Sequence, residues 1–251
     1  MGRVRGNPVT TAREDELIVA ETFGPTFQGE GPSAGQQAVF IRLSRCNLSC
    51  GTHPSASWAC DTPYTWDWER FDPKDPEVAR RESVGALLAW ALSLPPRLVV
   101  VTGGEPMLQW RGLERLAVGL RAAGREVEVE TNGTLVPDSA LVEAVTAFNV
   151  SPKLAAAGDS ERRRIVPDAL ASLARCGKAR FKFVVTHLGE LEEIAALVRR
   201  FALREVWVMP EGTTAGAVLE GLRAVAEETL ARGWHLSARQ HVLIWGDGRG
   251  R

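Results

Sequence analysis

The sequence lacks a large excess of charge of either sign, an apolar run of membrane length and a regular pattern of cysteines. Its formal net charge is −1 over 251 residues, so bulk electrostatics predict no attraction to nucleic acid or to an anionic membrane. No apolar stretch reaches the length of a membrane span, and residues 1–13 have no apolar segment behind them as a signal peptide would. We therefore expect a cytoplasmic protein.

Cysteine is scarce, and the uneven spacing of the four residues does not resemble a disulfide framework. Three of them, Cys46, Cys50 and Cys60, lie in one loop, whereas Cys176 is far away. A structural zinc site or an iron–sulfur cluster held by protein alone uses four ligands. Three thiolates would leave one coordination position open, which suggests that a small molecule supplies the last ligand. A zinc site completed by His53, or unrelated thiols, are the alternatives.

Apolar strands alternate with amphipathic helices along the chain, after a polar leader at residues 1–15. This alternation predicts a parallel sheet with helical crossovers. About six β/α units are visible, fewer than in a closed eightfold barrel. We therefore expect residues 16–251 to form one α/β domain, a partial (β/α)6-like barrel with a mostly parallel sheet. The expected strands are 17–23, 38–43, 98–101, 127–131, 148–151, 181–186, 206–209 and 241–246, and the expected helices are 83–94, 108–123, 138–146, 167–175, 190–200 and 215–232.

Four residues that could carry chemistry lie at or just beyond the carboxyl ends of expected strands. They are Cys46, Gly103, Glu130 and Ser151. In barrels and open parallel sheets, ligands bind at that edge. These residues are therefore predicted to belong to one site.

The cysteine loop after a strand, together with Gly103-Gly104-Glu105-Pro106, resembles the radical S-adenosylmethionine superfamily. Within this superfamily, five further motifs resemble the 7-carboxy-7-deazaguanine synthase family. The likeness runs from about residue 18 to residue 246, and the motifs are specific in this combination and order. The motifs are Gln28-Gly29-Glu30-Gly31, Cys60-Asp61-Thr62, Glu130-Thr131-Asn132-Gly133, Ser151-Pro152-Lys153 and Met209-Pro210-Glu211-Gly212.

Two features of the cysteine loop depart from the usual superfamily pattern. Cys46 and Cys50 keep the usual three intervening residues, but nine residues rather than two precede Cys60. A longer loop is chemically tolerable if the three sulfurs still converge, because lengthening a loop adds little entropy of closure. The residue before the third cysteine is Ala59 instead of an aromatic, and Trp58 stands one place earlier.

The resemblance implies that Cys46, Cys50 and Cys60 each bind one iron of a [4Fe–4S] cluster as thiolates. S-adenosylmethionine would chelate the open iron and, on reduction, release a 5′-deoxyadenosyl radical, which is chemistry of the cofactor. The two glycines allow close backbone approach, and a carboxylate after them can pair with the ammonium group of the cofactor. The alternative for Gly103-Gly104-Glu105 is a plain turn at the end of a strand, and the alternative for Lys153 is a solvated surface lysine. The implied cofactor-binding residues are Asp61, Gly103, Gly104, Glu105, Ser151 and Lys153.

The implied substrate is 6-carboxy-5,6,7,8-tetrahydropterin, a flat polar heterocycle that carries a carboxylate. A planar cation suits the carboxylate, and the resemblance assigns this role to Arg42. Thr62 resembles the position whose hydroxyl reaches a Mg²⁺ ion that bridges to the substrate. Alternatively, Arg42 is an outward-facing arginine of a strand, Thr62 is a turn residue, and His241 is a core or surface histidine. The remaining implied substrate contacts are Gln28, Glu30, Thr102, Glu130 and His241.

The implied reaction is that of a lyase. Hydrogen abstraction at C6 of the pterin is followed by ring contraction and loss of ammonia, giving 7-carboxy-7-deazaguanine for 7-deazapurine (queuosine-type) biosynthesis. The family also implies a homodimer, and a flavodoxin or ferredoxin as electron donor. A glycyl-radical activase or a non-enzymatic zinc or iron–sulfur protein is the alternative, although the Gln28–Gly31 loop and Thr62 disfavour the activase. No basic patch supports a nucleic-acid partner.

Overall fold

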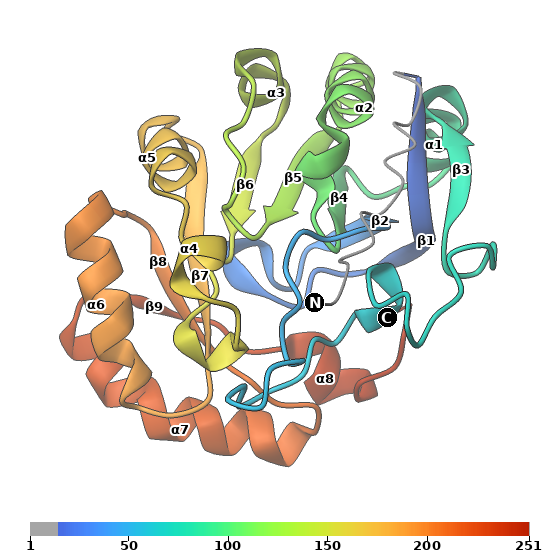
Figure 1. Cartoon of the computed structure of the whole chain (residues 1–251). Coiled ribbons are helices and arrows are strands. Elements are labelled where there is room, and N and C mark those ends of the chain that lie inside the picture. Colours follow the sequence, from blue (N-terminus) through green and yellow to red (C-terminus); the bar gives the residue numbers. More distant parts are fainter. Residues whose placement is uncertain (1–14, 251) are drawn as a thin grey trace, which may run out of the picture.

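A nine-stranded sheet runs through residues 15–250, the part of the chain that the computed structural model describes. Strand order is β3-β1-β2-β4-β5-β6-β7-β8-β9; β1 pairs antiparallel with β2 and β3, and all later neighbours are parallel. The sheet curves into an open barrel (Figure 1), which confirms the predicted fold class. The strands are β1 (Glu16–Phe27), β2 (Gln37–Leu43), β3 (Arg80–Ser83), β4 (Leu98–Gly103), β5 (Glu126–Thr131), β6 (Ala147–Val150), β7 (Ala179–Val185), β8 (Val206–Pro210) and β9 (His235–Leu236).

Helices cover the outer side of the curved sheet, as Figure 1 shows. In α2 the fully buried Leu113, Leu116 and Leu120 recur at helical spacing and join one apolar cluster with strand residues such as Val127 and Val129. This cluster is the main core of the protein. The helices are α1 (Val84–Leu92), α2 (Trp110–Ala122), α3 (Ser139–Ala144), α4 (Glu161–Arg164), α5 (Pro167–Arg175), α6 (Glu190–Phe201), α7 (Ala215–Ala231) and α8 (Gln240–Trp245).

Side chains alternate between the two faces of each strand, because successive residues of a strand point to opposite sides. Val127 and Val129 of β5 enter the outer core, so Glu128 and Glu130 point to the inner face. Phe148 and Val150 of β6 likewise flank an inward Asn149. The inner face therefore presents polar groups near the carboxyl ends of the strands.

The predicted strand at 241–246 is wrong, because this segment forms the helix α8. Its run of valine, leucine, isoleucine and tryptophan has strand-like composition, yet among the helix residues only Val242 is buried. The backbone N–H of Gln240 donates to the carbonyl of Gly29 at 2.7 Å, and α8 contacts α7. These tertiary contacts override the local preference for a strand. The other predicted elements agree with the structure to within a few residues.

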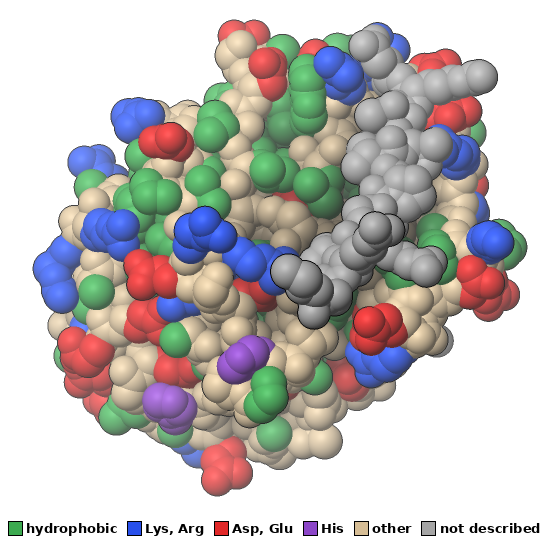
Figure 2. Space-filling view, viewed as in Figure 1, with side chains coloured by type: hydrophobic (Ala, Val, Ile, Leu, Met, Phe, Trp, Pro, Cys, Tyr) green, Lys and Arg blue, Asp and Glu red, His purple; other side chains and the backbone are tan. Residues whose placement is uncertain are grey.

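The face shown in Figure 2 carries acidic and basic side chains interspersed with apolar ones. Among the described residues, no helix is both long and apolar enough to cross a membrane. The predicted leader at residues 1–15 lies outside the described residues except for Asp15.

Candidate functional site

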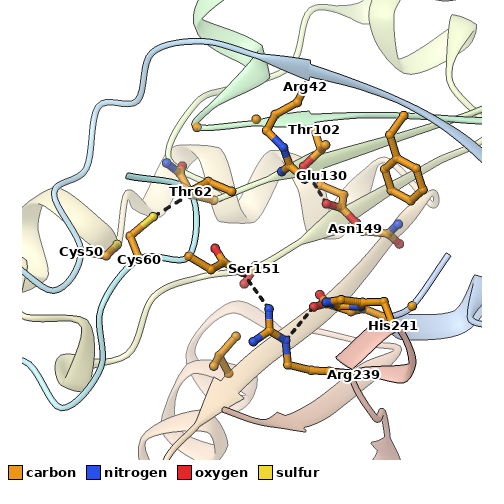
Figure 3. Close-up of a pocket in the computed structure, with 18 of the residues that line it drawn as sticks. Arg42, Cys50, Cys60, Thr62, Thr102, Glu130, Asn149, Ser151, Arg239 and His241 are labelled. Carbon is orange, nitrogen blue, oxygen red and sulfur yellow. Dashed lines mark hydrogen bonds and ion pairs between the residues drawn. The ribbon is translucent and has the colours of Figure 1, made fainter. Parts of the chain in front are cut away.

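A cavity of about 290 Å³ opens at the carboxyl ends of the parallel strands, on the inner side of the barrel. It brings together every residue predicted for the site except Glu105, and Figure 3 shows several of them pointing into one space. The predicted residues that line it are Gln28, Glu30, Arg42, Cys46, Cys50, Cys60, Asp61, Thr62, Thr102, Gly103, Gly104, Glu130, Ser151, Lys153 and His241.

The three loop cysteines lie at one end of this cavity, in a small apolar cluster with Leu48 and Trp58. Burial raises the pKa of Cys46 to about 12 and the pKa of Cys50 to about 11. Binding of iron as thiolate would displace these protons, since metal ligation requires the deprotonated sulfur. Cys176 instead packs against the main core.

Two of the three cysteine sulfurs, those of Cys46 and Cys60, accept N–H hydrogen bonds. The backbone N–H of Leu48 donates to Cys46 Sγ at 3.4 Å, and the indole N–H of Trp66 donates to Cys60 Sγ at 3.4 Å. The hydroxyl of Thr62 lies 3.6 Å from Cys60 Sγ. Hydrogen bonds of this kind stabilise cluster-bound thiolates and tune the reduction potential of the cluster. The donor set therefore fits an iron–sulfur cluster held by three cysteines.

The zinc alternative fits less well. No group of three or more histidine, cysteine or acidic side chains among residues 15–250 converges closely enough to hold a single metal ion. His53 is exposed, and its Nδ1 lies 2.7 Å from the hydroxyl of Ser55. The fourth ligand that this alternative needs is therefore directed elsewhere.

The lengthened part of the cysteine loop, residues 51–59, folds against the short 3₁₀ turn Ala155–Ala157. The N–H groups of Gly51 and Ser57 donate to the carbonyls of Ala157 and Ala156, at 2.9 and 2.8 Å. The carboxylate of Asp159 accepts from the backbone N–H of Ser49 at 3.0 Å. The lengthened loop is thus hydrogen-bonded to the segment after β6, and Cys60 still lines the cavity with Cys46 and Cys50.

Gly103 and Gly104 lie in close contact with the start of the cysteine loop. A Cβ atom on Gly103 would lie 2.1 Å from the carbonyl oxygen of Leu43, and one on Gly104 would lie 2.3 Å from that of Arg45. Gly103 also has a φ of +151°, which side chains rarely adopt. Only glycine permits this approach, which brings the end of β4 against the loop that carries Cys46.

Glu105 follows the two glycines but does not line the cavity. Its side chain is fully buried, and its carboxylate accepts hydrogen bonds from the hydroxyl of Thr131 and the backbone N–H groups of Met107 and Asn132. Burial raises the pKa of this carboxyl. In this structure Glu105 joins the end of β4 to the end of β5, which is a different position from the predicted contact with the cofactor.

Ser151 and Lys153 occupy the predicted place beyond β6. The Lys153 ammonium donates to the hydroxyl of Ser151 at 3.0 Å and lies 5.8 Å from the centre of the Trp58 ring. Trp58 therefore supplies an aromatic ring beside the residues that are predicted to bind the cofactor. Lys153 is only partly exposed, which disfavours the solvated surface alternative.

Polar side chains from neighbouring strands form the middle of the cavity. Glu130 of β5 accepts from the hydroxyl of Thr102 at 2.7 Å and from the side-chain amide of Gln28 at 3.1 Å. Asn149 of β6 is the register partner of Glu130 and also lines the cavity. This row presents hydrogen-bonding groups side by side, as recognition of a flat heterocycle requires.

Arg42 points into the cavity from β2, which contradicts the outward-facing alternative. Its Nε donates to Glu21 at 2.7 Å, and the same carboxylate accepts from the Tyr64 hydroxyl at 2.8 Å and from Arg249 at 2.9 Å. The terminal nitrogens of Arg42 make no hydrogen bond to any described residue. Arg249 belongs to the segment 247–250, which borders the cavity beyond α8.

Glu30 is held by two cations. Lys182 of β7 pairs with one oxygen, and Nε of Arg239 lies 3.2 Å from the other. Burial alone would raise the pKa of the Glu30 carboxyl, but these two cations lower it well below its ordinary range. Arg239 also donates to Asp61 at 2.8 Å and so links the loop at 28–31 to the cysteine loop.

His241 packs against Gly29, where an added Cβ would lie 2.1 Å from its Nδ1. Burial lowers the pKa of this histidine, so the ring is mainly neutral at pH 7. It lines the cavity, which disfavours a purely structural core position.

Several residues that line the cavity are absent from the predicted site, among them the polar residues Asn149, Lys182 and Arg239. Asn149 and Lys182 each interrupt an apolar strand with a polar side chain on the inner face, and this pattern could have identified them. Arg239 offers no such signal, because its partners lie far away in the sequence.

The chain is similar to proteins of known function along almost its whole length, although it matches none of the protein-family models with which it was compared. It is 37% identical over 236 residues to the 7-carboxy-7-deazaguanine synthase of Pyrobaculum aerophilum, covering 93% of this chain and 96% of that protein. Identity to the 7-carboxy-7-deazaguanine synthase of Rhodopirellula baltica is 33% over 253 residues, with coverages of 95% and 90%. Among solved structures, the crystal structure of QueE from Escherichia coli is similar, with a TM-score of 0.65 and 26% identity over 88% of this chain and 93% of that one.

Proposed function

Because this chain belongs to the 7-carboxy-7-deazaguanine synthase family, we propose that its cavity converts 6-carboxy-5,6,7,8-tetrahydropterin into 7-carboxy-7-deazaguanine. The observation that carries this proposal is the composition of one cavity: three cysteines at one end, and polar side chains from four neighbouring strands opposite them. A flat polar substrate that binds to these strand residues would lie beside the three cysteines.

The cysteines Cys46, Cys50 and Cys60 would hold a [4Fe–4S] cluster, with hydrogen bonds to sulfur from Leu48 and Trp66. Together with bound S-adenosylmethionine, the cluster supplies a 5′-deoxyadenosyl radical when reduced. Gly103 and Gly104 would lie beside this cofactor, because without side chains they pack directly against residues 43–46, where the first cysteine lies. Asp61, Ser151 and Lys153 would contact the polar groups of S-adenosylmethionine. Glu105 would not touch the cofactor but would hold the glycine turn in place through its hydrogen bond with Asn132.

We assign the substrate carboxylate and the pterin ring to opposite ends of the row of inner-face residues on β2, β4, β5 and β6. The terminal nitrogens of Arg42, which make no hydrogen bond within residues 15–250, would bind the carboxylate in the bidentate manner of guanidinium groups. Gln28 and Glu130 would bind the ring edges, and Thr102 orients Glu130 through its hydroxyl. Glu30 and His241 would close the opposite side of the ring pocket.

Thr62 is proposed to bind a Mg²⁺ ion that bridges to the substrate. It lies beside Cys60 and lines the cavity, so its hydroxyl can supply one oxygen ligand. Mg²⁺ typically takes one or two ligands from protein and the others from substrate and water.

The reaction would begin with removal of a hydrogen atom from C6 of the pterin, and ring contraction and loss of ammonia would follow. The chain contributes orientation and exclusion of water, because the cavity lies between the cysteine loop and the segment 247–250. We further propose that the protein acts as a homodimer in the cytoplasm and receives electrons from a flavodoxin or ferredoxin.

Anaerobic turnover tests the proposal directly. Reconstituted protein is incubated with S-adenosylmethionine, a reductant, Mg²⁺ and the carboxytetrahydropterin, and 7-carboxy-7-deazaguanine is measured by mass spectrometry. Product is expected from the wild type and from the Cys176→Ala control, but not from Cys60→Ala. Accumulation of 5′-deoxyadenosine without deazaguanine would refute the substrate, as expected for a glycyl-radical activase. Absence of both, in protein with an intact cluster, would refute the radical mechanism.

A further inference from the structure

Asn149 combines a place in the cavity wall with an unused hydrogen-bond acceptor. The residue lies on the inner face of β6, is 4% exposed and lines the cavity beside Glu130. Its Oδ1 atom is buried and has no hydrogen-bond partner among the described residues. Because burying a polar atom without a partner is unfavourable, a ligand that donates to it would gain affinity.

The orientation of the Asn149 amide is fixed by a hydrogen bond to Glu128. Asn149 Nδ2 donates to one oxygen of Glu128 at 2.8 Å, while the other oxygen accepts from the Ser33 hydroxyl at 2.6 Å and from Arg180 at 2.9 Å. An ionised carboxylate can only accept hydrogen bonds, and the Arg180 guanidinium provides its counter-charge. The NH₂ group of Asn149 must therefore face Glu128, so the amide carries Oδ1 on its other side.

Four inner-face residues on consecutive strands define the direction of the cavity. Arg42 and Thr102 are register partners on β2 and β4, Thr102 bonds to Glu130 on β5, and Glu130 is the register partner of Asn149 on β6. Three strand spacings, roughly 14 Å, separate the backbones at the two ends of this row. A pterin likewise carries its carboxylate and its 2-amino group at opposite ends of the ring system.

We propose that Asn149 Oδ1 accepts a hydrogen bond from the 2-amino group of the substrate and so selects an aminopyrimidine over an oxo analogue. This inference rests on the proposed function and adds a specificity-determining residue to it. Glu128 acts as a positioning residue, because it fixes which atom of the amide the ligand meets. A site built to accept a hydrogen bond discriminates strongly against a ligand that cannot donate one.

The test compares two fluorescent ligands on the anaerobic holoprotein. One is 6-carboxypterin, and the other is 6-carboxylumazine, which has an oxygen in place of the 2-amino group. The wild type is expected to bind 6-carboxypterin more tightly. Asn149→Ala is expected to bind 6-carboxypterin roughly tenfold more weakly and to lose most of the preference between the two ligands.

Two further variants keep the test decisive. Glu128→Gln replaces the carboxylate with an amide that can donate to Oδ1, so the Asn149 side chain can turn over and the preference should fall. Ser33→Ala removes a different hydrogen bond to Glu128 without touching the cavity, and its preference should match the wild type. If Asn149→Ala does not fold, Glu128→Gln carries the test alone.

The outcomes separate the two proposals. An unchanged ligand preference in Asn149→Ala or Glu128→Gln protein that still binds S-adenosylmethionine would overturn the role of Asn149 while the proposed function stands. Wild-type protein that binds neither ligand would refute the pterin substrate, and the role of Asn149 with it.

Discussion

Arg42 shows how a single residue is prepared for binding. Its Nε is held by Glu21 at 2.7 Å, and that carboxylate is balanced in turn by Tyr64 and Arg249. The guanidinium is therefore fixed in direction by one nitrogen, while its two terminal nitrogens make no hydrogen bond to another described residue. A pre-oriented planar cation loses little conformational entropy when a carboxylate binds.

Arg42→Lys is expected to raise the KM for the carboxytetrahydropterin about thirtyfold, because a lysine cannot keep the bond to Glu21 and bind a carboxylate at two points. Cluster content and binding of S-adenosylmethionine should be unchanged. Initial rates of product formation against substrate concentration measure the effect. Arg81→Lys is the control, since Arg81 of the edge strand β3 pairs with Glu16 of β1, and neither residue lines the cavity. Equal KM values for the two variants would show that Arg42 does not bind the carboxylate.

Glu30 makes stability depend on pH in a defined direction. Burial favours its neutral form, but Lys182, Arg239 and, more weakly, His241 lower the pKa of its carboxyl below the ordinary value of 4.5. A lowered pKa in the folded state contributes stability above pH 4.5, and this stability is lost as the pH falls through the folded-state pKa. At pH 7 the contribution is fully present.

We therefore expect Glu30→Gln to lower the free energy of unfolding by about 3 kcal/mol at pH 7, because the buried cations Lys182 and Arg239 lose the carboxylate that they share. The difference from the wild type should shrink steadily below pH 4.5. Urea unfolding of the cluster-free proteins, repeated at intervals of about half a pH unit between pH 3 and pH 7, measures this difference in the free energy of unfolding. Glu192→Gln, an exposed member of an ion pair with Arg232, should change little at any pH. A difference that stays constant on acidification would rule out the ion pairs as its source.

At the scale of elements, the strand-to-helix turn after β4 and the cysteine loop after β2 depend on each other. The N–H of Glu105 donates to the carbonyl of Arg45 at 2.8 Å, and Gly104 leaves no room for a side chain against Arg45 and Cys46. The position of the first cysteine is thus set by a glycine more than fifty residues away in the chain.

Gly104→Ala should displace the cysteine loop, because the new Cβ would lie 2.3 Å from the carbonyl oxygen of Arg45 and 2.9 Å from the Cβ of Cys46. We expect the iron content after anaerobic reconstitution to fall to less than roughly half of the wild-type value. Iron analysis and the visible absorbance of the cluster report the loss. Gly85→Ala in α1, where a Cβ meets nothing within 4 Å, should retain full iron content. Full iron content in both variants would disprove the coupling between the two loops.

The sequence predicted these elements well where period and composition agree. The helices Val84–Leu92 and Pro167–Arg175 agree with the predicted ranges 83–94 and 167–175, and the strands 98–101 and 206–209 are continuous apolar runs in parallel sheet. Helix α8 escaped prediction because its composition favours a strand and only its contacts with Gly29 and α7 decide otherwise.

Most of the site was likewise predictable, because parallel strands bring their carboxyl ends to one edge. The motifs at Cys60, Gly103 and Ser151 therefore meet although they are far apart in the chain. Glu105 was misplaced because a motif names a residue but not the direction of its side chain. Asn149 owes its orientation to Glu128, and a hydrogen-bond network of this kind cannot be read from sequence spacing.

At the scale of the whole molecule, the sheet is open, and the C-terminal segment from Arg239 onward contacts the loop after β1 near the cavity. Arg239 contacts Glu30, Asp61 and the carbonyl of Gly212, three segments that lie up to 209 residues away. The next residue, Gln240, donates its N–H to the carbonyl of Gly29. The C-terminal segment thus joins the loop at 28–31 to the cysteine loop.

Removal of this link should weaken the whole fold rather than one loop. Arg239→Met keeps much of the side-chain volume but leaves Glu30 with one cation instead of two, so we expect a loss of about 3 kcal/mol in the free energy of unfolding at pH 7. Hydrogen exchange should rise in α8 and in the loop at 28–31 together, because both depend on the same guanidinium. Arg232→Met is the matched control, since Arg232 also pairs with two carboxylates, Glu192 and Glu228, but on the outer surface, where ion pairs contribute little. If the two variants lose the same stability, or if exchange rises in α8 alone, Arg239 does not close the barrel.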